Sequence, residues 1–453
     1  MKNILFYLFA ILAISGCKKL IEVGTPKNQL TTDKVFSDTS SAIAALGNIY
    51  AQMDKTIESN ISINMDLYAD DLSYTGSTSQ LLEFKNSAVT ADNTSVLTLW
   101  QNLYYAIYQC NDLIEQLPVS GKIPEASVTQ LTGEALFLRA YSYYILVNLY
   151  GNIPLLTTTN VNVNAQAGQA GESLVNQQII SDLTAAAKML TAAYRGGGRV
   201  RANSAAVQAL LAKVYLSQKN WSQAESCSTA VINSNLYSLD SCANTFLANS
   251  SETILQIWNQ SGFVTSAVIL LPASNSDIPL FPVSSSLLNS FETGDLRKVN
   301  WIGYNNITDG TNTTSYAYYN KYKNRLQNSS NSEYLTVFRL AEIYLTRAEA
   351  RANQNKVMGS TGAEADVNII RNRAGLLNTQ ANDQLSMLAA IAQERRVELF
   401  GEWANRFYDL KRSGTLNTVI GSAKPKWVST AQALPIPLNE LTYDTHLVQN
   451  PGY

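Results

Sequence analysis

Histidine, charge and long apolar runs are all scarce in this 453-residue sequence. The single histidine, His446, leaves few metal sites and almost no Ser/His or Cys/His catalytic arrangement, because histidine is the commonest general base. Only 15% of the residues are charged, against roughly 25% in average soluble domains, and the net charge is -2. No dense Lys/Arg run is present to follow a phosphate backbone. We therefore expect no metal, no cofactor and no nucleic acid.

Cysteine is also rare, with Cys17, Cys110, Cys227 and Cys242 as the whole set. No two of them have C-x-x-C spacing, so zinc knuckles and thioredoxin-like sites are not supported. If Cys17 carries lipid, three cysteines remain. A disulfide between Cys227 and Cys242 is then open in an oxidising compartment, but it would leave one thiol over. Buried free thiols are the preferred interpretation.

The amino terminus has the pattern of a secretory signal. Lys2 precedes an apolar run from Ile4 to Ile14, which is too short to span a bilayer, and Ser15-Gly16-Cys17 follows. The tetrapeptide Ile14-Ser15-Gly16-Cys17 resembles a bacterial lipobox, in which the cysteine carries acyl chains. We predict a signal over residues 1–16, lipidation at Cys17 and a tether over residues 17–39. An ordinary cleaved signal is the alternative.

Helical periodicity dominates the rest of the chain. We predict helices over about 40–117 with a polar loop at 70–77, and then over 128–150, 203–233 with a break at 218–220, 335–352, 362–374 and 385–413. Residues 252–331 are rich in Gly, Asn, Ser, Thr and Pro, which favours irregular loops with short strands. We divide the body into residues 40–250 and 251–453.

A short pattern recurs in three of these helices: Arg139-Ala140-x-x-Tyr143, Leu211-Ala212-x-x-Tyr215 and Leu340-Ala341-x-x-Tyr344. A small alanine permits close helix crossing, and the tyrosine three residues later lies on the same face. In the middle copy Ala224 follows Tyr215 by nine residues, which resembles a tetratricopeptide helix pair. The predicted fold is mainly α, a tetratricopeptide-like helix-pair scaffold with long irregular loop insertions and few short strands.

Several longer stretches together resemble the SusD/RagB family of outer-membrane lipoproteins. The matching stretches are Glu134 to Tyr141 running on to Asn148–Leu155, Ala209 to Leu216 with Trp221 and Ala224, Tyr334 to Ala350, Val367 to Gly375, Glu394 to Arg412, Pro435-Ile436-Pro437 and Gln449 to Tyr453. Their order and the lipobox make the resemblance specific over nearly the whole chain.

The resemblance implies a cell-surface lipoprotein of the outer membrane that binds oligosaccharide and passes it to a SusC-like TonB-dependent transporter. It implies a binding protein rather than an enzyme. An uptake role for peptides or another oligomer is the alternative in the same system. Two other classes stay open: an all-helical glycoside hydrolase using paired carboxylates, and a tetratricopeptide adaptor for a protein tail.

Binding a sugar needs flat aromatic faces together with polar groups that satisfy the hydroxyls. A first group of candidates lies in the polar loop and the helix after it: Asp70, Asp71, Tyr74, Trp100 and Asn102. The alternative is that Trp100 is a core residue and the aspartates are helix caps or loop polar groups.

A second candidate group consists of Trp258, Trp301 and Tyr304, in and around a Gly/Asn-rich segment. Packing of these rings beneath the loop is the equal alternative. Asp295 and Arg297 are interpreted as a structural ion pair. Trp221, Trp403 and Phe407 occur at helical spacing in apolar stripes, which indicates core positions. No catalytic residue is proposed.

Glu394, Glu398 and Glu402 recur every four residues, and paired carboxylates hydrolyse glycosides. Arginines accompany them along the same helix, which favours an ion-paired packed helix over a catalytic pair. The Gly196-Gly197-Gly198 segment has neither the Lys-Ser/Thr nor the preceding strand of a phosphate-binding loop. It is expected to be an interhelical loop.

Overall fold

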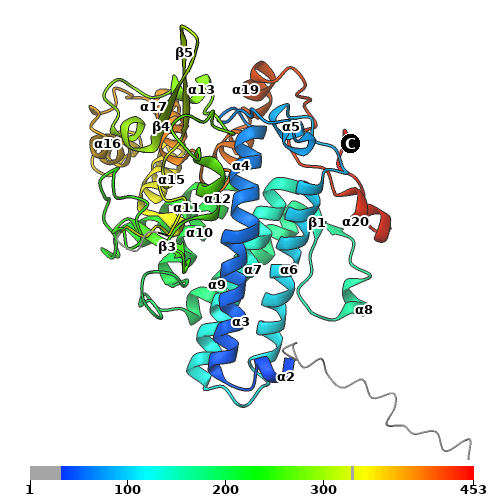
Figure 1. Ribbon diagram of the computed structural model, residues 1–453. Coiled ribbons are helices and arrows are strands. Elements are labelled where there is room, and N and C mark those ends of the chain that lie inside the picture. The colour runs from blue at the N-terminus through cyan, green and yellow to red at the C-terminus, as the bar shows by residue number, and fades with distance from the viewer. Residues whose placement is uncertain (1–31, 328–330) are drawn as a thin grey trace, which may run out of the picture.

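The computed structural model describes residues 32–327 and 331–453, and most of this chain is helical (Figure 1). The signal, the lipobox and most of the tether therefore lie outside the described residues. The longer helices are α3 (Thr39–Gln52), α4 (Ser59–Tyr68), α6 (Thr94–Gln116), α7 (Glu125–Tyr150), α9 (Glu172–Met189), α10 (Ser204–Ser217), α11 (Trp221–Ile232), α15 (Leu340–Asn353), α16 (Ala363–Arg373), α17 (Gln384–Leu399), α18 (Asn405–Ser413) and α19 (Leu416–Ala423). The predicted mainly α fold is confirmed.

Short elements connect these helices. The short helices are α2 (Thr32–Val35), the π-helix η2 (Met53–Glu58), α5 (Ser79–Lys85), α8 (Val161–Asn164), α12 (Thr265–Leu270), α13 (Ser285–Leu288), α14 (Leu296–Trp301) and α20 (Leu438–Tyr443). The strands are β1 (Ile153–Pro154), β2 (Gln169–Ala170), β3 (Thr253–Ile257), β4 (Ile302–Asp309), β5 (Asn312–Tyr319) and β6 (Leu335–Arg339). They form three antiparallel pairs, β1–β2, β3–β6 and β4–β5.

The first long helices form one rod that crosses the molecule from end to end (Figure 1, blue). Asp38 caps α3, because its Oδ1 accepts a hydrogen bond from the Ser41 amide at 2.9 Å. The π-helix η2 then continues α3 into α4 without a loop. The rod ends at Tyr68, just before the polar loop that was expected to interrupt this region.

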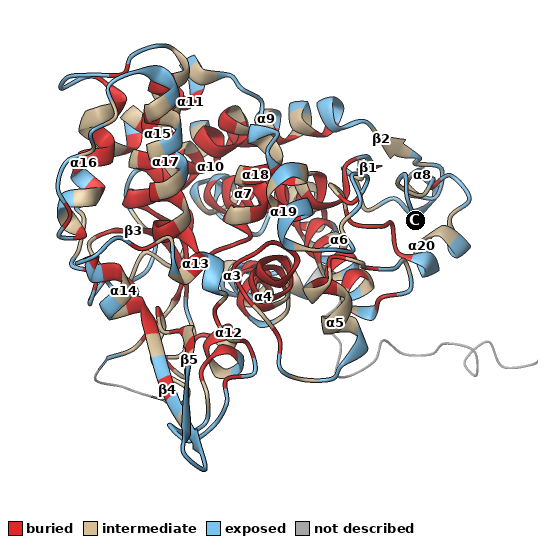
Figure 2. Cartoon of the chain, turned by 90° about the horizontal axis from the view of Figure 1, so that it is seen from above, coloured by how far each residue is buried: buried red, intermediate tan, exposed pale blue. Residues whose placement is uncertain are grey.

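Helix α7 is the centre of the scaffold, and nearly every residue from Gln130 onward is buried (Figure 2). It packs against α6 on one side and α9 on another. Gly133 makes the α9 contact close: a Cβ there would lie 2.9 Å from side-chain atoms of Met189 and Leu190. The helix ends at Gly151, whose φ of +75° suits glycine, as the sequence predicts.

The recurring alanine pattern marks the places where helices pack together. Ala140, Ala212 and Ala341 are all completely buried. Helices α10 and α11 form an antiparallel pair, and α11 packs on α15, which in turn packs on α16 and α17. The break between α10 and α11 falls at residues 218–220, where it was predicted.

Two predicted helices are wrong in part. Residues 335–339 form strand β6 rather than the first turn of a helix, because they pair with β3 through Gln256↔Thr336 and Ile257↔Leu335. The predicted helix at 385–413 is two helices, α17 and α18. Gly401, Trp403 and Ala404 between them have φ values of +70°, +48° and +59°, which no continuous right-handed helix accommodates.

The apolar core runs through both parts of the chain. A single cluster of buried side chains includes Leu103 of α6, Leu138 of α7, Leu255 of β3 and Phe407 of α18. The tip of the β4–β5 hairpin lies outside this core and is exposed (Figure 2). Among the described residues, no helix combines the length and the apolar character needed to cross a membrane.

Candidate functional site

Three segments far apart in the sequence meet at the end of the molecule that carries α5, α13, α19 and the β4–β5 hairpin (Figure 1, top). We call this end the upper face. The Ser73 amide donates to the Pro282 carbonyl at 2.8 Å, and the Thr75 amide donates to the Leu280 carbonyl at 3.1 Å. The Val283 amide donates to the Ala317 carbonyl of β5 at 2.9 Å. The polar loop after α4 is thus tied to the hairpin through residues 280–284.

The predicted ligand residues Asp70 and Asp71 form the ionic anchor of this loop. Arg396 Nη2 lies 2.7 Å from Asp70 Oδ2 and 3.1 Å from Asp71 Oδ1, and Arg406 Nε lies 2.9 Å from Asp70 Oδ1. Burial would raise the pKa of Asp70, but the two guanidinium groups outweigh it and hold that pKa below its ordinary value. Burial raises the pKa of Asp71, which is completely inaccessible. Both carboxylates are engaged in holding the loop.

The side chains of Tyr74 and Trp100 are also buried in packed surroundings rather than exposed to solvent. The Tyr74 ring is 4% exposed and lies against Phe281, with ring centroids 5.4 Å apart. Trp100 is 3% exposed and packs against Tyr104 and Tyr150. Since α6 begins at Thr94, Trp100 lies in its second turn and not at its start. Asn102 is half-buried on the same helix.

Trp100 does border a hollow of its own. A pocket of about 260 Å³ separates α6 from the segments around α8 and α20. Its wall includes Trp100, Tyr104, Glu440 and Asp444. This pocket shares no lining residue with the loop that carries the two aspartates, so the first group of candidates does not form one site.

Trp301 was a candidate ligand contact with packing beneath the loop as the equal alternative, and the structure shows the packed arrangement. Its side chain is completely buried at the end of α14, and its Nε1 donates to the Cys242 carbonyl at 2.6 Å. The Lys321 ammonium lies 4.9 Å from the ring centre and the Arg373 guanidinium 5.5 Å away. No face of the indole is open to a sugar, so Trp301 belongs to the core.

Tyr304 and Trp258 are the two candidate rings that are exposed, by 46% and 54% of their surface. Tyr304 lies on β4, and the neighbouring Asn305 fixes the strand by donating to the carbonyls of Ser274 and Asp277, each at 2.8 Å. Trp258 follows β3, apart from the hairpin, beside Asn259, whose amide donates to Asp54. The structure gives each ring a separate place on the surface.

A polar hollow of about 510 Å³ opens in the upper face, and we call it the upper pocket. Its lining is Asp70, Leu72, Ser73, Lys85, Asn86, Ser284, Ser285, Ser286, Ala423, Lys424, Pro425 and Lys426. Most of these residues have polar side chains, so the pocket offers hydrogen-bonding groups for a polyhydroxylated ligand beside its apolar surface. It adjoins the hairpin, since Val283 next to Ser284 is bonded to β5.

Sequence reasoning missed most of the upper pocket. Lys85 and Asn86 end α5, while Lys424 and Lys426 follow α19, and neither stretch has a distinctive motif. Burial lowers the pKa of Lys424 to about 8, although Asp70 opposes the shift. Its Nζ donates to the Leu67 carbonyl at 2.7 Å and to the Lys85 carbonyl at 2.6 Å. The ammonium thus ties α19 to the end of the rod.

The row of three glutamates is a structural ion network, with Glu394 and Glu398 on α17 and Glu402 in the turn that follows it. Glu394 Oε1 lies 2.5 Å from Arg297 Nη1, and Glu398 Oε2 lies 3.0 Å from the same nitrogen. Glu402 Oε2 accepts from Arg339 Nε at 2.8 Å. The remaining carboxylate oxygens of the three residues accept from Arg371, Arg373, Arg339 and Lys321. Each carboxylate oxygen of the three glutamates therefore accepts a hydrogen bond from an arginine or lysine. The expected ion pairing is present.

The pKa values of Glu394 and Glu398 in this network are shifted in opposite directions. Burial raises the pKa of Glu394 despite the opposing Arg297. Around Glu398, burial also opposes ionisation, but Arg373, Arg339 and Arg297 outweigh it and hold the pKa well below the ordinary value. Glu398 is thus an anion surrounded by three guanidinium groups.

The remaining sequence-based assignments can be placed as well. Cys110, Cys227 and Cys242 are buried free thiols, as preferred. The Asp295–Arg297 pair is present at 2.8 Å and is buried. Within residues 32–327 and 331–453, no group of three or more His, Cys, Asp or Glu could hold a metal ion.

Of the three residues predicted to lie in the core, two are buried and one is only half-buried. Trp403 and Phe407 are buried as expected. Trp221 is only half-buried, because it starts α11 at the edge of the scaffold rather than within it.

Comparison with known families is consistent with this architecture. A family model described as "Starch-binding associating with outer membrane" matches residues 21–216, and a model described as "SusD family" matches residues 287–453. SusD-like protein P25 of Formosa agariphila is 24% identical over 536 residues, covering 100% of this chain and 99% of the relative. Starch-binding protein SusD of Bacteroides thetaiotaomicron is 28% identical over 184 residues, covering 37% of this chain and 30% of that protein.

Solved structures agree with the sequence matches. A laminarin-binding SusD-like protein superposes with a TM-score of 0.77 at 27% identity, covering 92% of this chain and 99% of that one. A SusD superfamily protein from Parabacteroides distasonis gives a TM-score of 0.79 at 22% identity, with 94% and 100% covered. The fold is therefore that of the helical, tetratricopeptide-like SusD superfamily. The chain belongs to the SusD/RagB family.

Proposed function

We propose that this chain is a lipid-anchored protein of the outer-membrane surface that binds oligosaccharide and delivers it to a SusC-like TonB-dependent transporter. The observation that carries the proposal is the family membership. One matching family model is described as starch-binding and outer-membrane-associating, and a structural relative at 27% identity is described as laminarin-binding. Both descriptions concern polymers of glucose, which makes a glycan the first ligand class to test.

The upper face supports this proposal on chemical grounds. Sugar rings present apolar C–H faces to aromatic rings and hydroxyl groups to polar side chains. Tyr304 supplies an exposed ring on the hairpin, and the adjoining upper pocket supplies serine hydroxyls, Asn86 and the ammonium of Lys426. We propose this combination as the ligand site, with Trp258 as a separate surface contact for a longer chain.

The proposed role is non-catalytic. The glycosidase alternative needs two carboxylates free to protonate and attack a glycosidic bond. The carboxylates of Glu394 and Glu398 on α17, and of Glu402 in the turn after it, are buried and bonded to arginine or lysine. Nothing in their arrangement favours hydrolysis over structural pairing.

Fluorescence titration of the purified protein with neutral glucose oligomers of α- and β-linkage tests the site. Because an exposed stacking ring contributes roughly 1 kcal/mol or more to binding, Tyr304→Ala is expected to weaken affinity about fivefold to tenfold. Tyr443→Ala is the matched control, since Tyr443 is 87% exposed on α20, away from the upper pocket. Unchanged affinity in Tyr304→Ala would remove the upper face from consideration. Binding of peptides instead of glycans would favour the peptide-uptake alternative.

A further inference from the structure

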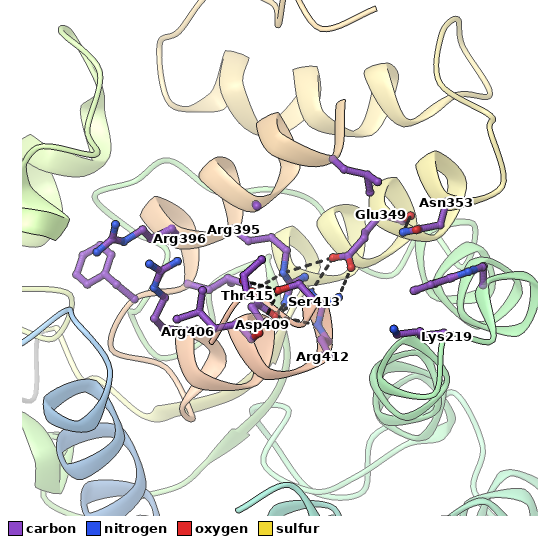
Figure 3. A pocket seen from close by; sticks show the side chains of 16 residues that line it. Lys219, Glu349, Asn353, Arg395, Arg396, Arg406, Asp409, Arg412, Ser413 and Thr415 are labelled. Carbon is purple, nitrogen blue, oxygen red and sulfur yellow. Dashed lines mark hydrogen bonds and ion pairs between the residues drawn. The ribbon is translucent and has the colours of Figure 1, made fainter. Parts of the chain in front are cut away.

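A third pocket, with a different character, lies behind the ionic anchor of Asp70. It has a volume of about 430 Å³, within the range of about 300–1,000 Å³ found for ligand pockets. Helices α15, α17 and α18 and the start of α11 enclose it. We call it the arginine pocket, because Arg395, Arg396, Arg406 and Arg412 all line it (Figure 3).

Two arginines separate this pocket from the upper pocket. Arg396 and Arg406 line the arginine pocket, whereas their partner Asp70 lines the upper pocket. The two hollows therefore lie on opposite sides of one ion cluster and share no lining residue. A ligand in the arginine pocket would be distinct from one bound at the upper face.

The same two arginines keep donors for a ligand. Arg396 uses Nε and Nη2 for Asp70, Asp71 and Ser286, and Arg406 uses Nε and Nη2 for Asp70. In residues 32–327 and 331–453, Nη1 of each guanidinium has no hydrogen-bond acceptor. These are strong charged donors that suit a carboxylate or sulfate oxygen.

The other end of the pocket carries a further cation and a ring. Lys219 is exposed in the turn between α10 and α11, and across the described chain no acidic partner lies within ion-pair distance of it. Figure 3 shows Lys219 at the opposite end of the pocket from Arg396 and Arg406. Trp221, two residues later, lines the same end and is half-buried, so part of its indole is open.

The charges of the middle of the pocket cancel. Arg395 Nε lies 2.7 Å from Asp409 Oδ2, and Arg412 bonds to both Asp409 and Glu349. The four arginines of the pocket are balanced by four carboxylates, those of Glu349, Asp409, Asp70 and Asp71. The charge of Lys219 is left without a balancing carboxylate. The free donors therefore lie at the two ends, with a neutralised, partly apolar floor formed by Leu388, Ala392 and Leu410 between them.

We propose that the arginine pocket binds an acidic oligosaccharide, with anionic groups facing Arg396 and Arg406 at one end and Lys219 at the other. The Trp221 ring provides the apolar contact for a sugar ring. Uronate carboxylates and sulfate esters share this chemistry. The site goes beyond the proposed neutral-glycan site and does not depend on it.

Calorimetric titration of the purified full-length protein in detergent tests the pocket directly. The first ligand is trigalacturonate, and the matched neutral ligand is its methyl ester. The acid is expected to bind at least tenfold tighter than the ester, and added salt should weaken its binding because charge pairs are screened. A sulfated galactose oligomer tests whether sulfate esters bind as uronate carboxylates do. Sodium sulfate alone tests whether the anion binds without a sugar. Equal affinity for acid and ester, or no binding of any acidic sugar, would overturn the proposal.

Variants locate the binding. Trp221→Ala and Lys219→Asn are each expected to weaken trigalacturonate binding about tenfold. Asparagine is chosen because Lys219 has a φ of +58°, which asparagine tolerates. Arg396→Lys keeps the charge but removes Nη1, and its melting temperature reports whether the anchor survives. Lys122→Asn, at an exposed loop, should leave this binding unchanged. Full affinity in both Trp221→Ala and Lys219→Asn would place the ligand elsewhere and refute the site.

Discussion

Glu58 is a buried acid that contributes to the pH response of this protein. It lies in η2 with 2% of its surface exposed, and its Oε2 has no hydrogen-bond partner among the described residues. Burial raises its pKa to about 7, although Ser62 and Ser266 partly offset the shift. Because the folded pKa exceeds the unfolded value, Glu58 stabilises the fold at low pH. That contribution is lost as pH rises from about 4.5 to about 7.

Glu58→Gln should remove this pH dependence. Since glutamine never ionises, the free energy of unfolding of the variant relative to wild type should increase between pH 4.5 and pH 8. The expected gain is on the order of 2–3 kcal/mol. Urea unfolding at several pH values measures it, with Asp92→Asn at an exposed position as control. A difference that stays constant across this range would show that Glu58 ionises normally in the fold.

At the residue scale, the sequence predicted burial correctly where the side chain belongs to an apolar stretch, and less well where it lies in a polar stretch. Phe407 lies on α18 and Trp403 in the turn before that helix, and both were placed correctly in the core. Trp301 occurs in a stretch rich in Gly and Asn, yet its position depends on the Cys242 carbonyl, 59 residues earlier in the chain. No local pattern contains that contact, which is why the sequence left Trp301 open between a ligand contact and a packed ring.

At the scale of elements, helix α17 is held by ion pairs as well as by apolar packing. The carboxylate of Glu398 has no exposed surface and contacts Arg297, Arg339 and Arg373. Helix α14, strand β6 and helix α16 contribute one of these arginines each. Glu398 therefore ties four separate elements together.

Glu398→Gln is accordingly expected to be strongly destabilising. Removing one partner of a buried ion pair typically costs about 3–5 kcal/mol, because the opposite charges stay buried. Glu292→Gln is the matched control, since Glu292 is 48% exposed and pairs with Arg371 at the surface, where less than about 1 kcal/mol is expected. Chemical denaturation compares the two variants. Similar small losses in both would contradict the buried-network interpretation.

Element boundaries also show what periodicity can and cannot predict. Helices α7, α10 and α11 were predicted to within a few residues, because caps, glycine and proline mark their ends. Strand β6 was missed, since Leu335-Thr336-Val337-Phe338-Arg339 is apolar enough for a helix or a strand and only its pairing with β3 decides between them. The upper pocket was missed for a related reason: its residues come from four distant segments.

At the scale of the whole molecule, the proposed role requires the protein to be held at the membrane by its amino terminus. The residues that would do this are Ile14-Ser15-Gly16-Cys17, which precede the described part of the chain. Several acyl chains would anchor stably, because each buried CH₂ contributes about 0.8 kcal/mol. Lipidation at Cys17 stays a prediction.

Cys17→Ala should release the protein from the membrane fraction. Membrane fractionation followed by immunoblotting measures the shift, and labelling with a palmitate analogue should be lost at the same time. Cys227→Ala serves as control, because Cys227 is a buried thiol of the folded body and should leave the anchor intact. Continued membrane association of Cys17→Ala would argue against lipidation at this residue.

The central claim is that this SusD/RagB family protein binds a glycan without breaking it. Equilibrium dialysis against end-labelled oligosaccharides, followed by chromatography of the recovered sugar, tests both halves of that claim in one measurement. The account predicts saturable binding of at least one glycan and recovery of the label at its original chain length. Recovery of shorter sugars, or the absence of binding across neutral and acidic glycans alike, would contradict it.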